Sequence, residues 1–316
     1  MAASYTEEKL RIFVMGSGAI GAYFGARLQQ AGEEVVFGAR GENLRALNER
    51  GLLVESPKGD LSLKVKATDK PREIAPYELV LFTVKSFDTE DAAALLDGCL
   101  APGGVILTLQ NGVENEARLA TIFGRERVMG GNARAGVELV APGHAVHVSN
   151  GFIEFGELDG SRTARAERLA EVFRRAGIFG SIIDDVTPAR WYKLLWNATF
   201  NTITTLCRRR VGVVVGDPQG LALARGVLDE IAAVARAEGA RIGAAEVETL
   251  LTRTRERLQN VRPSTLQDLE RGRRLEYDAL TGAVVRAADR HGLEIPLTRG
   301  LHTLIKLLAE RPRQGR

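Results

Sequence analysis

Short apolar runs alternate with helical stretches over roughly the first 185 residues of the chain. Four runs have the length and composition of buried strands: Leu10–Met15, Glu33–Phe37, Leu79–Val84 and Val105–Leu109. Helical periodicity separates them, first over Ala22–Gln30. This alternation is typical of a parallel sheet covered by helices on both faces.

Weaker β signals complete this half of the chain. Two stretches, Leu52–Val65 and Val137–Phe155, each contain a hairpin-like turn with proline and glycine. A helix is expected over Ala164–Ala176 and a strand over Ile178–Ile183.

Beyond Asp185 the strand signal nearly disappears. Thr187 and Pro188 suit the N-cap and first position of a helix that runs to about Leu206, and long helical patterns follow. The sequence therefore predicts an α/β fold with a doubly wound sheet over residues 1–185 and an all-helical domain over 186–316. Substrate is expected in the cleft between the two domains.

A glycine-rich turn follows the first apolar run and precedes a helix. It consists of Gly16, Ser17, Gly18, Ala19, Ile20 and Gly21. In a turn of this spacing the first glycine permits the tight bend, the second lets the backbone approach a pyrophosphate, and the third allows close packing of helix and strand. The phosphates would bind at the N-terminus of the helix. The strand before and the helix after supply the context of a Rossmann-type dinucleotide site, although similar turns also arise without a nucleotide.

The edge of the second strand indicates which dinucleotide binds. An NAD site usually carries a carboxylate there for the ribose 2′-hydroxyl, whereas this edge reads Phe37, Gly38, Ala39, Arg40. A guanidinium suits a 2′-phosphate because its fork of donors matches phosphate oxygens. We therefore expect NADP(H) bound through Arg40; a solvated loop arginine is the alternative.

Composition excludes several classes of function. The net charge of +3 is small, and the arginine-rich stretches are interrupted by acidic residues, so no nucleic-acid partner is expected. The two cysteines and four histidines have no metal-binding spacing, so no metal is expected and a reducing compartment is favoured. No leader or membrane-spanning run is apparent, so we expect a cytoplasmic protein with no membrane partner. An exposed apolar helical face in the second domain would suit a homodimer.

A polar stripe lies on the first helix of the second domain. Lys193, Asn197 and Asn201 are spaced at i, i+4 and i+8, which places them on one side of an α-helix with a drift of about 80°. Reduction of a carbonyl by a nicotinamide needs a proton donor for the developing alkoxide, and a lysine can supply it. Glu276 is a candidate for orienting this site. A solvated helix face and a surface glutamate are the alternatives.

Two segments follow predicted strands where a doubly wound sheet binds its ligands. They are Thr83–Ser86, which contains Lys85, and Gln110–Val113, which contains Asn111. Ordinary loop chemistry is the alternative for both, but their position favours cofactor and substrate contacts.

Together these motifs resemble the ketopantoate reductases, or 2-dehydropantoate 2-reductases, over nearly the whole chain. The matching pieces are the glycine turn, Arg40, Val84-Lys85, Gln110–Val113, the Trp191/Lys193/Asn197/Asn201 pattern, the segment from Ser264 to Gly282, and Pro296. The resemblance implies NADPH-dependent reduction of 2-dehydropantoate to (R)-pantoate in pantothenate biosynthesis.

The resemblance also implies roles for individual residues. Lys193 would be the general acid, with Asn111 and Glu276 shaping the active site and contributing to the cofactor site. Arg40 and Lys85 would hold the cofactor. The substrate's hydroxyl and carboxylate groups would be held by Asn197, Asn201 and Ser264.

The chain departs from the family pattern in places. Pro263-Ser264-Thr265-Leu266 stands where members often read Ser-Ser-Met, Thr281 stands where Asn is frequent, and the run Arg208–Arg210 is unusual. Two other functions stay open: a reductase of a different 2-oxo acid on the same scaffold, and a non-catalytic NADPH sensor. A sensor would have no use for the proton donor Lys193.

Overall fold

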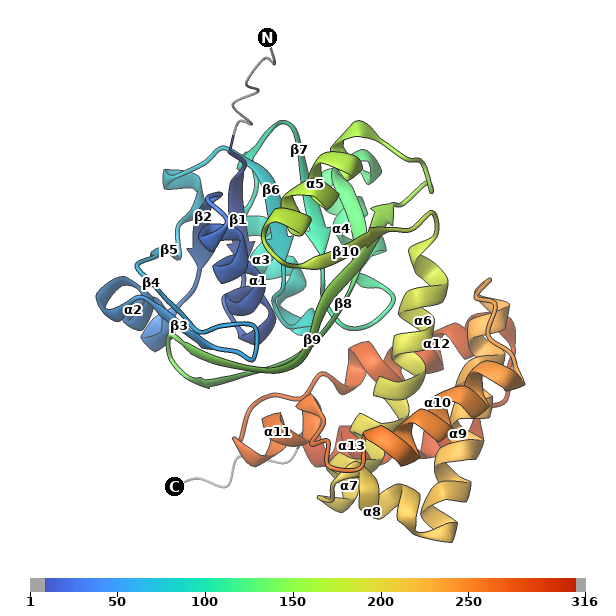
Figure 1. The fold of residues 1–316 in the computed structure, drawn as a ribbon. Helices are drawn as coiled ribbons and strands as arrows, with labels where there is room; N and C mark the ends of the chain where they lie inside the picture. Colours follow the sequence, from blue (N-terminus) through green and yellow to red (C-terminus); the bar gives the residue numbers. More distant parts are fainter. Residues whose placement is uncertain (1–8, 311–316) are drawn as a thin grey trace. The chain divides into compact units, whose positions relative to one another are not determined.

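The computed structural model describes residues 9–310, which form two compact units by their internal contacts (Figure 1). The sheet unit comprises the residues up to Gln110 together with Asn115–Val186. The helical unit comprises Asn111–Glu114 together with the residues from Thr187 onward. A four-residue segment from the first half of the chain thus belongs to the helical unit.

Over the residues that the structure describes, the sheet unit contains ten strands in one mixed sheet. They are β1 (Arg11–Met15), β2 (Glu34–Gly38), β3 (Leu52–Glu55), β4 (Leu61–Leu63), β5 (Lys66–Thr68), β6 (Tyr77–Phe82), β7 (Leu100–Thr108), β8 (Val128–Ala141), β9 (His144–Glu157) and β10 (Phe179–Ile182). The four buried strands predicted from sequence are confirmed as β1, β2, β6 and β7. Both predicted hairpins are confirmed as the antiparallel pairs β3–β4 and β8–β9.

The order β5-β2-β1-β6-β7 gives this sheet its doubly wound core, in which all neighbouring pairs are parallel. The chain moves from β1 to β2 on one side and later returns to β6 on the other. The carboxyl ends of β1 and β6 therefore form a topological switch point, where such sheets bind their ligands.

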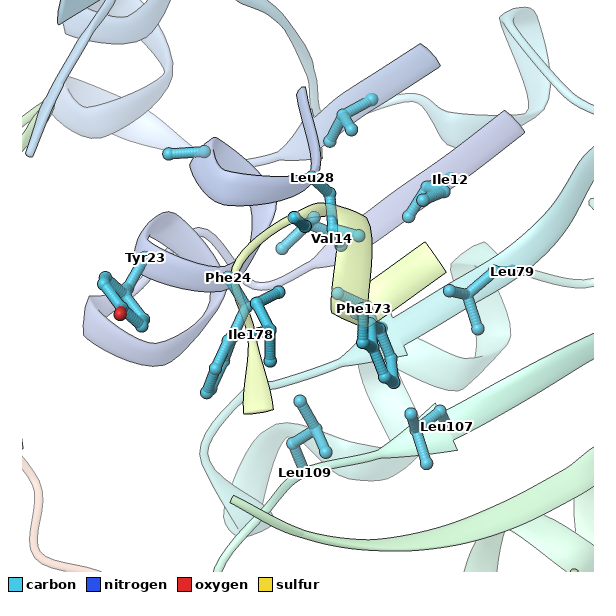
Figure 2. Packing of buried hydrophobic residues seen from close by; sticks show 14 of the residues in the cluster. Ile12, Val14, Tyr23, Phe24, Leu28, Leu79, Leu107, Leu109, Phe173 and Ile178 are labelled. Carbon is cyan, nitrogen blue, oxygen red and sulfur yellow. The ribbon is translucent and has the colours of Figure 1, made fainter. Parts of the chain in front are cut away.

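Helices cover both faces of the sheet. They are α1 (Ala19–Gln30), α2 (Gly41–Arg50), α3 (Thr89–Leu95), α4 (Asn115–Phe123) and α5 (Ala164–Arg175), with short 3₁₀ turns η1 (Pro71–Glu73), η2 (Ser86–Asp88) and η3 (Arg125–Arg127). Alternate residues of β1 explain the two layers, since Val14 packs with Phe24 of α1 and Phe173 of α5 (Figure 2), whereas Phe13 faces α3. Strand periodicity thus directs side chains into two separate cores.

The helical unit continues from α6 to α13. Its elements are α6 (Val186–Trp196), the π-helical turn η4 (Asn197–Asn201), α7 (Thr202–Cys207), α8 (Val211–Gly216), α9 (Pro218–Ala237), α10 (Ala244–Arg257), α11 (Ser264–Glu270), the π-helical turn η5 (Asp278–Gly282), α12 (Ala283–His291) and α13 (Pro296–Ala309). Its core gathers apolar side chains from α6, η4, α9 and α12 around Trp191 and Phe200. Within residues 9–310, no helix is long and apolar enough to cross a bilayer.

The predicted start of α6 is wrong by two residues. The helix begins at Val186, so Pro188 stands at the third helical position. The first N–H groups of a helix have no intrahelical acceptor, so proline is tolerated there as well as at the first position. The predicted continuous α-helix to Leu206 is also interrupted, because η4 separates α6 from α7.

Candidate active site

The glycine turn has the backbone geometry that its spacing predicts. Gly16 has a φ of +101°, and a Cβ built there would lie 2.8 Å from the backbone nitrogen of Val84. A Cβ at Gly21 would lie 2.2 Å from the carbonyl oxygen of Gly16. A Cβ at Gly18, by contrast, would meet no atom within 4 Å. Gly16 and Gly21 are therefore required by packing, whereas Gly18 leaves open space for a ligand.

That open space lies at the N-terminus of α1. Gly18 is the N-cap of this helix and has no side chain to accept from its first N–H groups. Ser17 is not directed at this end, because its hydroxyl donates to the carbonyl of Gly38 at 2.9 Å. The first turn, which contains Ala19 and Ile20, therefore presents backbone donors that fit a pyrophosphate.

The loop after β6 is attached to the same turn. The hydroxyl of Thr83 donates to the carbonyl of Gly16 at 2.7 Å. Lys85 is half-buried at the position before η2, in extended conformation. The loop that carries Lys85 is thus fixed beside the glycine turn within the sheet unit.

Arg40 lies at the carboxyl end of β2, where it precedes α2. Its side chain is 80% exposed, and its guanidinium forms an ion pair of 2.7 Å with Asp88, the last residue of η2. Asn43 of α2 donates to the carbonyl of Ser17 at 3.0 Å, which ties this edge to the glycine turn. The Asp88 carboxylate at Arg40 was missed from sequence. The sequence signal that could have indicated it is the position of Asp88 in a loop that follows a buried strand, where ligand-binding residues are expected.

Gln110 braces the end of β7. Its side-chain amide donates to the carbonyl of Val84 at 3.1 Å and to the hydroxyl of Thr89 at 2.9 Å, and its oxygen accepts from Thr108 at 3.0 Å. The side chain is buried. Its role within the sheet unit is therefore to join two strand-end loops.

Asn111 and the next three residues belong to the helical unit. Gly112 has a φ of +97°, and a Cβ there would lie 2.8 Å from the carbonyl oxygen of Ala279. The guanidinium of Arg190, on α6, donates to the carbonyl of Gly112. Burial lowers the pKa of Arg190 to about 9, so the guanidinium stays charged at neutral pH. Arg190 was missed from sequence, where it is one arginine among many.

Lys193 is half-buried on α6, three residues after Arg190. The stripe that it begins continues into the π-helical turn with Asn197, which is half-buried, and Asn201, which is buried. A π-helix bonds i to i+5, so each residue turns through a smaller angle than in an α-helix. The geometry from Asn197 to Asn201 therefore differs from that of the predicted α-helix.

Asn201 connects the stripe to α11. Its side-chain nitrogen donates to the hydroxyl of Thr265 at 3.2 Å, while its side-chain oxygen is buried and accepts no hydrogen bond. Ser264, the neighbour of Thr265, is exposed at the first position of α11. The pair brings two of the predicted substrate-binding segments together and leaves one buried acceptor on Asn201.

Glu276 is buried just before η5. The turn η5 contacts η4, so the two π-helical turns of the helical unit lie against each other near the predicted site residues. Turns of this kind occur frequently at functional sites. Thr281 in η5 hydrogen-bonds Nδ1 of His302 on α13 at 3.0 Å, so the residue that replaces the frequent Asn has a partner within the unit.

Comparison with known proteins identifies both halves of the chain. Residues 12–160 match the family described as ketopantoate reductase PanE/ApbA, and residues 185–309 match its C-terminal counterpart. A 2-dehydropantoate 2-reductase of Archaeoglobus fulgidus is 38% identical over 297 residues, covering 94% of this chain and 97% of its own. One of Pyrococcus horikoshii is 31% identical over the same length and coverage.

Solved structures agree with this assignment. The 2-dehydropantoate 2-reductase of Geobacter metallireducens is 38% identical with a TM-score of 0.90, covering 95% of this chain and 100% of its own. A D-mandelate dehydrogenase solved with NADH and anilino(oxo)acetate shares the fold, with a TM-score of 0.88 at 22% identity, covering 93% of this chain and 97% of its own. The chain therefore belongs to the ketopantoate reductase PanE/ApbA family of oxidoreductases, whose members use a nicotinamide cofactor.

Proposed function

We propose that this protein reduces 2-dehydropantoate to (R)-pantoate with NADPH. Family membership supports the reaction type. The substrate is supported chiefly by the arrangement at Asn201, whose nitrogen is engaged by Thr265 and whose buried oxygen accepts no hydrogen bond. A buried acceptor of this kind fits a hydroxyl group, because an unsatisfied buried oxygen is costly. The substrate 2-dehydropantoate carries such a hydroxyl, whereas many 2-oxo acids lack one.

The sheet unit would hold the cofactor. The open space at Gly18 and the first N–H groups of α1 fit the pyrophosphate, and Arg40 fits the 2′-phosphate. When bound, the nicotinamide supplies a hydride to the carbonyl carbon of the substrate. A 2′-phosphate at Arg40 would share or replace the Asp88 carboxylate as its partner. Asp88 is therefore expected to reduce the preference for NADPH.

The helical unit would hold the substrate and move the proton. Lys193 donates a proton to the alkoxide oxygen that develops at the carbonyl, and Ser264, Asn197 and Asn201 hold the carboxylate and the hydroxyl. Asn111 and Glu276 orient the reacting groups, so that the carbonyl stays aligned during the transfer.

A substrate panel tests this proposal. NADPH oxidation is measured with 2-dehydropantoate, with the same acid lacking its hydroxyl (3,3-dimethyl-2-oxobutanoate), and with aromatic 2-oxo acids. We expect 2-dehydropantoate to have the highest kcat/KM, with about 10-fold to 10²-fold loss for the analogue without the hydroxyl.

Other results of the panel would redirect the assignment. Higher kcat/KM for an aromatic or branched 2-oxo acid would identify a different reductase on the same scaffold. NADPH binding without turnover of any acid would identify a binding protein instead of an enzyme.

A further inference from the structure

The segment Asn111–Glu114 belongs to the helical unit, although the residues before and after it in sequence belong to the sheet unit. The residues on either side of it are fixed in the sheet unit, Gln110 by Val84 and Thr89, and Asn115 by a hydrogen bond of 3.2 Å to the hydroxyl of Ser86. Between them, Val113 packs against the hydrophobic core of the helical unit. Something in the helical unit must therefore hold these four residues in place.

An arginine 172 residues further along the chain binds the end of this segment. The guanidinium of Arg286, on α12, grips the carboxylate of Glu114 through two parallel hydrogen bonds, Nε to Oε1 at 3.0 Å and Nη2 to Oε2 at 2.7 Å. Nη1 of the same guanidinium donates to the Asp278 carboxylate at 2.8 Å, and Nη2 to the Asp278 carbonyl at 3.0 Å. The hydrogen bonds to Glu114 raise the pKa of Arg286, which agrees with a permanently charged anchor.

The geometry of these contacts relates the segment to the proposed catalytic groups. Arg190, which holds the carbonyl of Gly112, lies on the same side of α6 as Lys193, three residues later. Asp278, the second partner of Arg286, follows Glu276 by two residues. The backbone around Asn111 is thus attached to the helix that carries Lys193 and to the turn that follows Glu276.

We propose that Arg286 is a positioning residue for the reduction: by fixing Glu114 it holds Asn111 in register with Lys193 and Glu276. This inference rests on the proposed function. Partly exposed ion pairs contribute little to the free energy of unfolding, but two parallel hydrogen bonds between Arg286 and Glu114 restrict the position of the Glu114 side chain. Misplacement of an orienting group by about 1 Å costs roughly 10² in rate, so the pair acts on turnover more than on stability.

Four single variants and the double variant Arg286→Met/Glu114→Gln test the proposal in the full-length protein. Arg286→Met removes the grip, Glu114→Gln removes the charge with little change of shape, and Arg286→Lys keeps the charge without the fork. The matched control is Arg299→Met, which breaks an ion pair of 2.7 Å between α13 and Asp289 of α12; the Arg299 side chain is about as exposed as that of Arg286.

Single-turnover hydride transfer at saturating NADPH and 2-oxo acid is the first measurement. We expect Arg286→Met and Glu114→Gln to lower the rate by about 10-fold to 10²-fold, with the KM for NADPH within about 2-fold of wild type. The double variant should be no slower than the slower single variant, because both substitutions remove the same interaction between Arg286 and Glu114. Arg286→Lys should lie between, and Arg299→Met should match wild type. Rates for Arg286→Met and Glu114→Gln that equal the control, or a lowered Tm with unchanged rate, would overturn the proposal.

Hydrogen exchange of the backbone amides in residues 111–114 is the second measurement, and it needs neither cofactor nor substrate. Exchange should be faster in Arg286→Met than in Arg299→Met, and equal exchange would show that Arg286 does not hold the segment. A wild-type protein that turns over no 2-oxo acid would overturn the proposed function and the catalytic part of this inference. The exchange result would still decide whether the grip orders the segment.

Discussion

The sheet unit and the helical unit build their parts of the candidate site by different means. In the sheet unit, the backbone shapes the candidate site. Gly16 and Gly21 are required because neighbouring backbone atoms leave no room for a Cβ, and Thr83 and Gln110 hold the loops at the strand ends through hydrogen bonds. In the helical unit, the proposed site consists of individual side chains on or next to a π-helical turn, and partners such as Glu114 and Arg286 are far apart in sequence. Substitutions in the two units should therefore fail in different ways.

The largest effect is expected at Lys193, the proposed proton donor. Lys193→Ala should lower turnover by roughly 10² to 10⁴, as expected for loss of a general acid, while NADPH binding in the sheet unit is retained. Single-turnover kinetics and thermal melting of the same variant separate chemistry from folding. A folded variant with near-normal turnover would refute the assignment of Lys193.

The glycine turn should respond through packing and through ligand binding separately. Gly21→Ala puts a Cβ 2.2 Å from the Gly16 carbonyl oxygen and should cost about 1 to 3 kcal/mol of stability. Gly18→Ala is the matched control, because its Cβ meets no protein atom within 4 Å. It should leave Tm unchanged and weaken NADPH binding. Equal loss of Tm in both variants would contradict the distinction.

Cofactor choice should rest on Arg40 and its partner Asp88. Arg40→Ala should weaken NADPH binding by about 1 to 3 kcal/mol and affect NADH much less, since only NADPH has the 2′-phosphate. Asp88→Asn should tighten NADPH binding a few-fold by removing a competing carboxylate from Arg40. Dissociation constants for both cofactors give the answer. Parallel changes for NADPH and NADH would rule out a phosphate contact.

Substrate binding should depend on the contact between η4 and α11. Asn201→Ala and Ser264→Ala should each raise the KM for the 2-oxo acid by roughly 10-fold with a smaller change in kcat, because each loses about one hydrogen bond to the substrate. Thr265→Val is a useful comparison, since it removes only the partner of Asn201. Unchanged KM in all three would make this contact purely structural.

The smallest effect concerns acid stability of the sheet unit. The ring of His147 stacks on Tyr23 at 4.2 Å, and its two nitrogens face the Ser56 hydroxyl and the carbonyls of Ser149 and Asn150. Burial lowers the pKa of His147, and the nearby cations of Lys58 and Arg27 lower it further. The unfolded chain therefore binds this proton more readily, and stability should fall as pH drops below about 6.5 toward the lower folded pKa.

Thermal melting at pH 7.5 and 5.5 tests this expectation. Wild type should lose more Tm between the two values than His147→Gln, which cannot take up the proton. An equal loss in the two proteins would assign the acid sensitivity to other groups.

Sequence alone predicted the sheet unit well, for physical reasons. A buried strand needs a continuous apolar run and a tight turn needs glycine, so β1, β2, β6, β7 and the glycine turn are all encoded locally. The structure gives the positions of the predicted site residues, from Gly16 to Glu276; their roles stay predictions, as does the domain boundary at 185.

The helical unit was less predictable because its decisive features are not local. Nothing in the spacing of Asn197 and Asn201 distinguishes a π-helical turn from an α-helix, since the turn depends on how the helices pack. Likewise Arg190 and Arg286 are two arginines in an arginine-rich sequence, and only the folded chain shows that they bind the segment after Asn111.

The assignment of Asn111–Glu114 to the helical unit also limits how halves of this protein can be exchanged with those of its relatives. A chimaera that joins the sheet unit of one relative to the helical unit of another at a single crossover near residue 186 would separate Gly112 and Glu114 from the Arg190 and Arg286 that bind them. Productive chimaeras should instead exchange the four-residue segment together with the helical half. The segments that form the two units thus alternate along the chain, although each unit is compact.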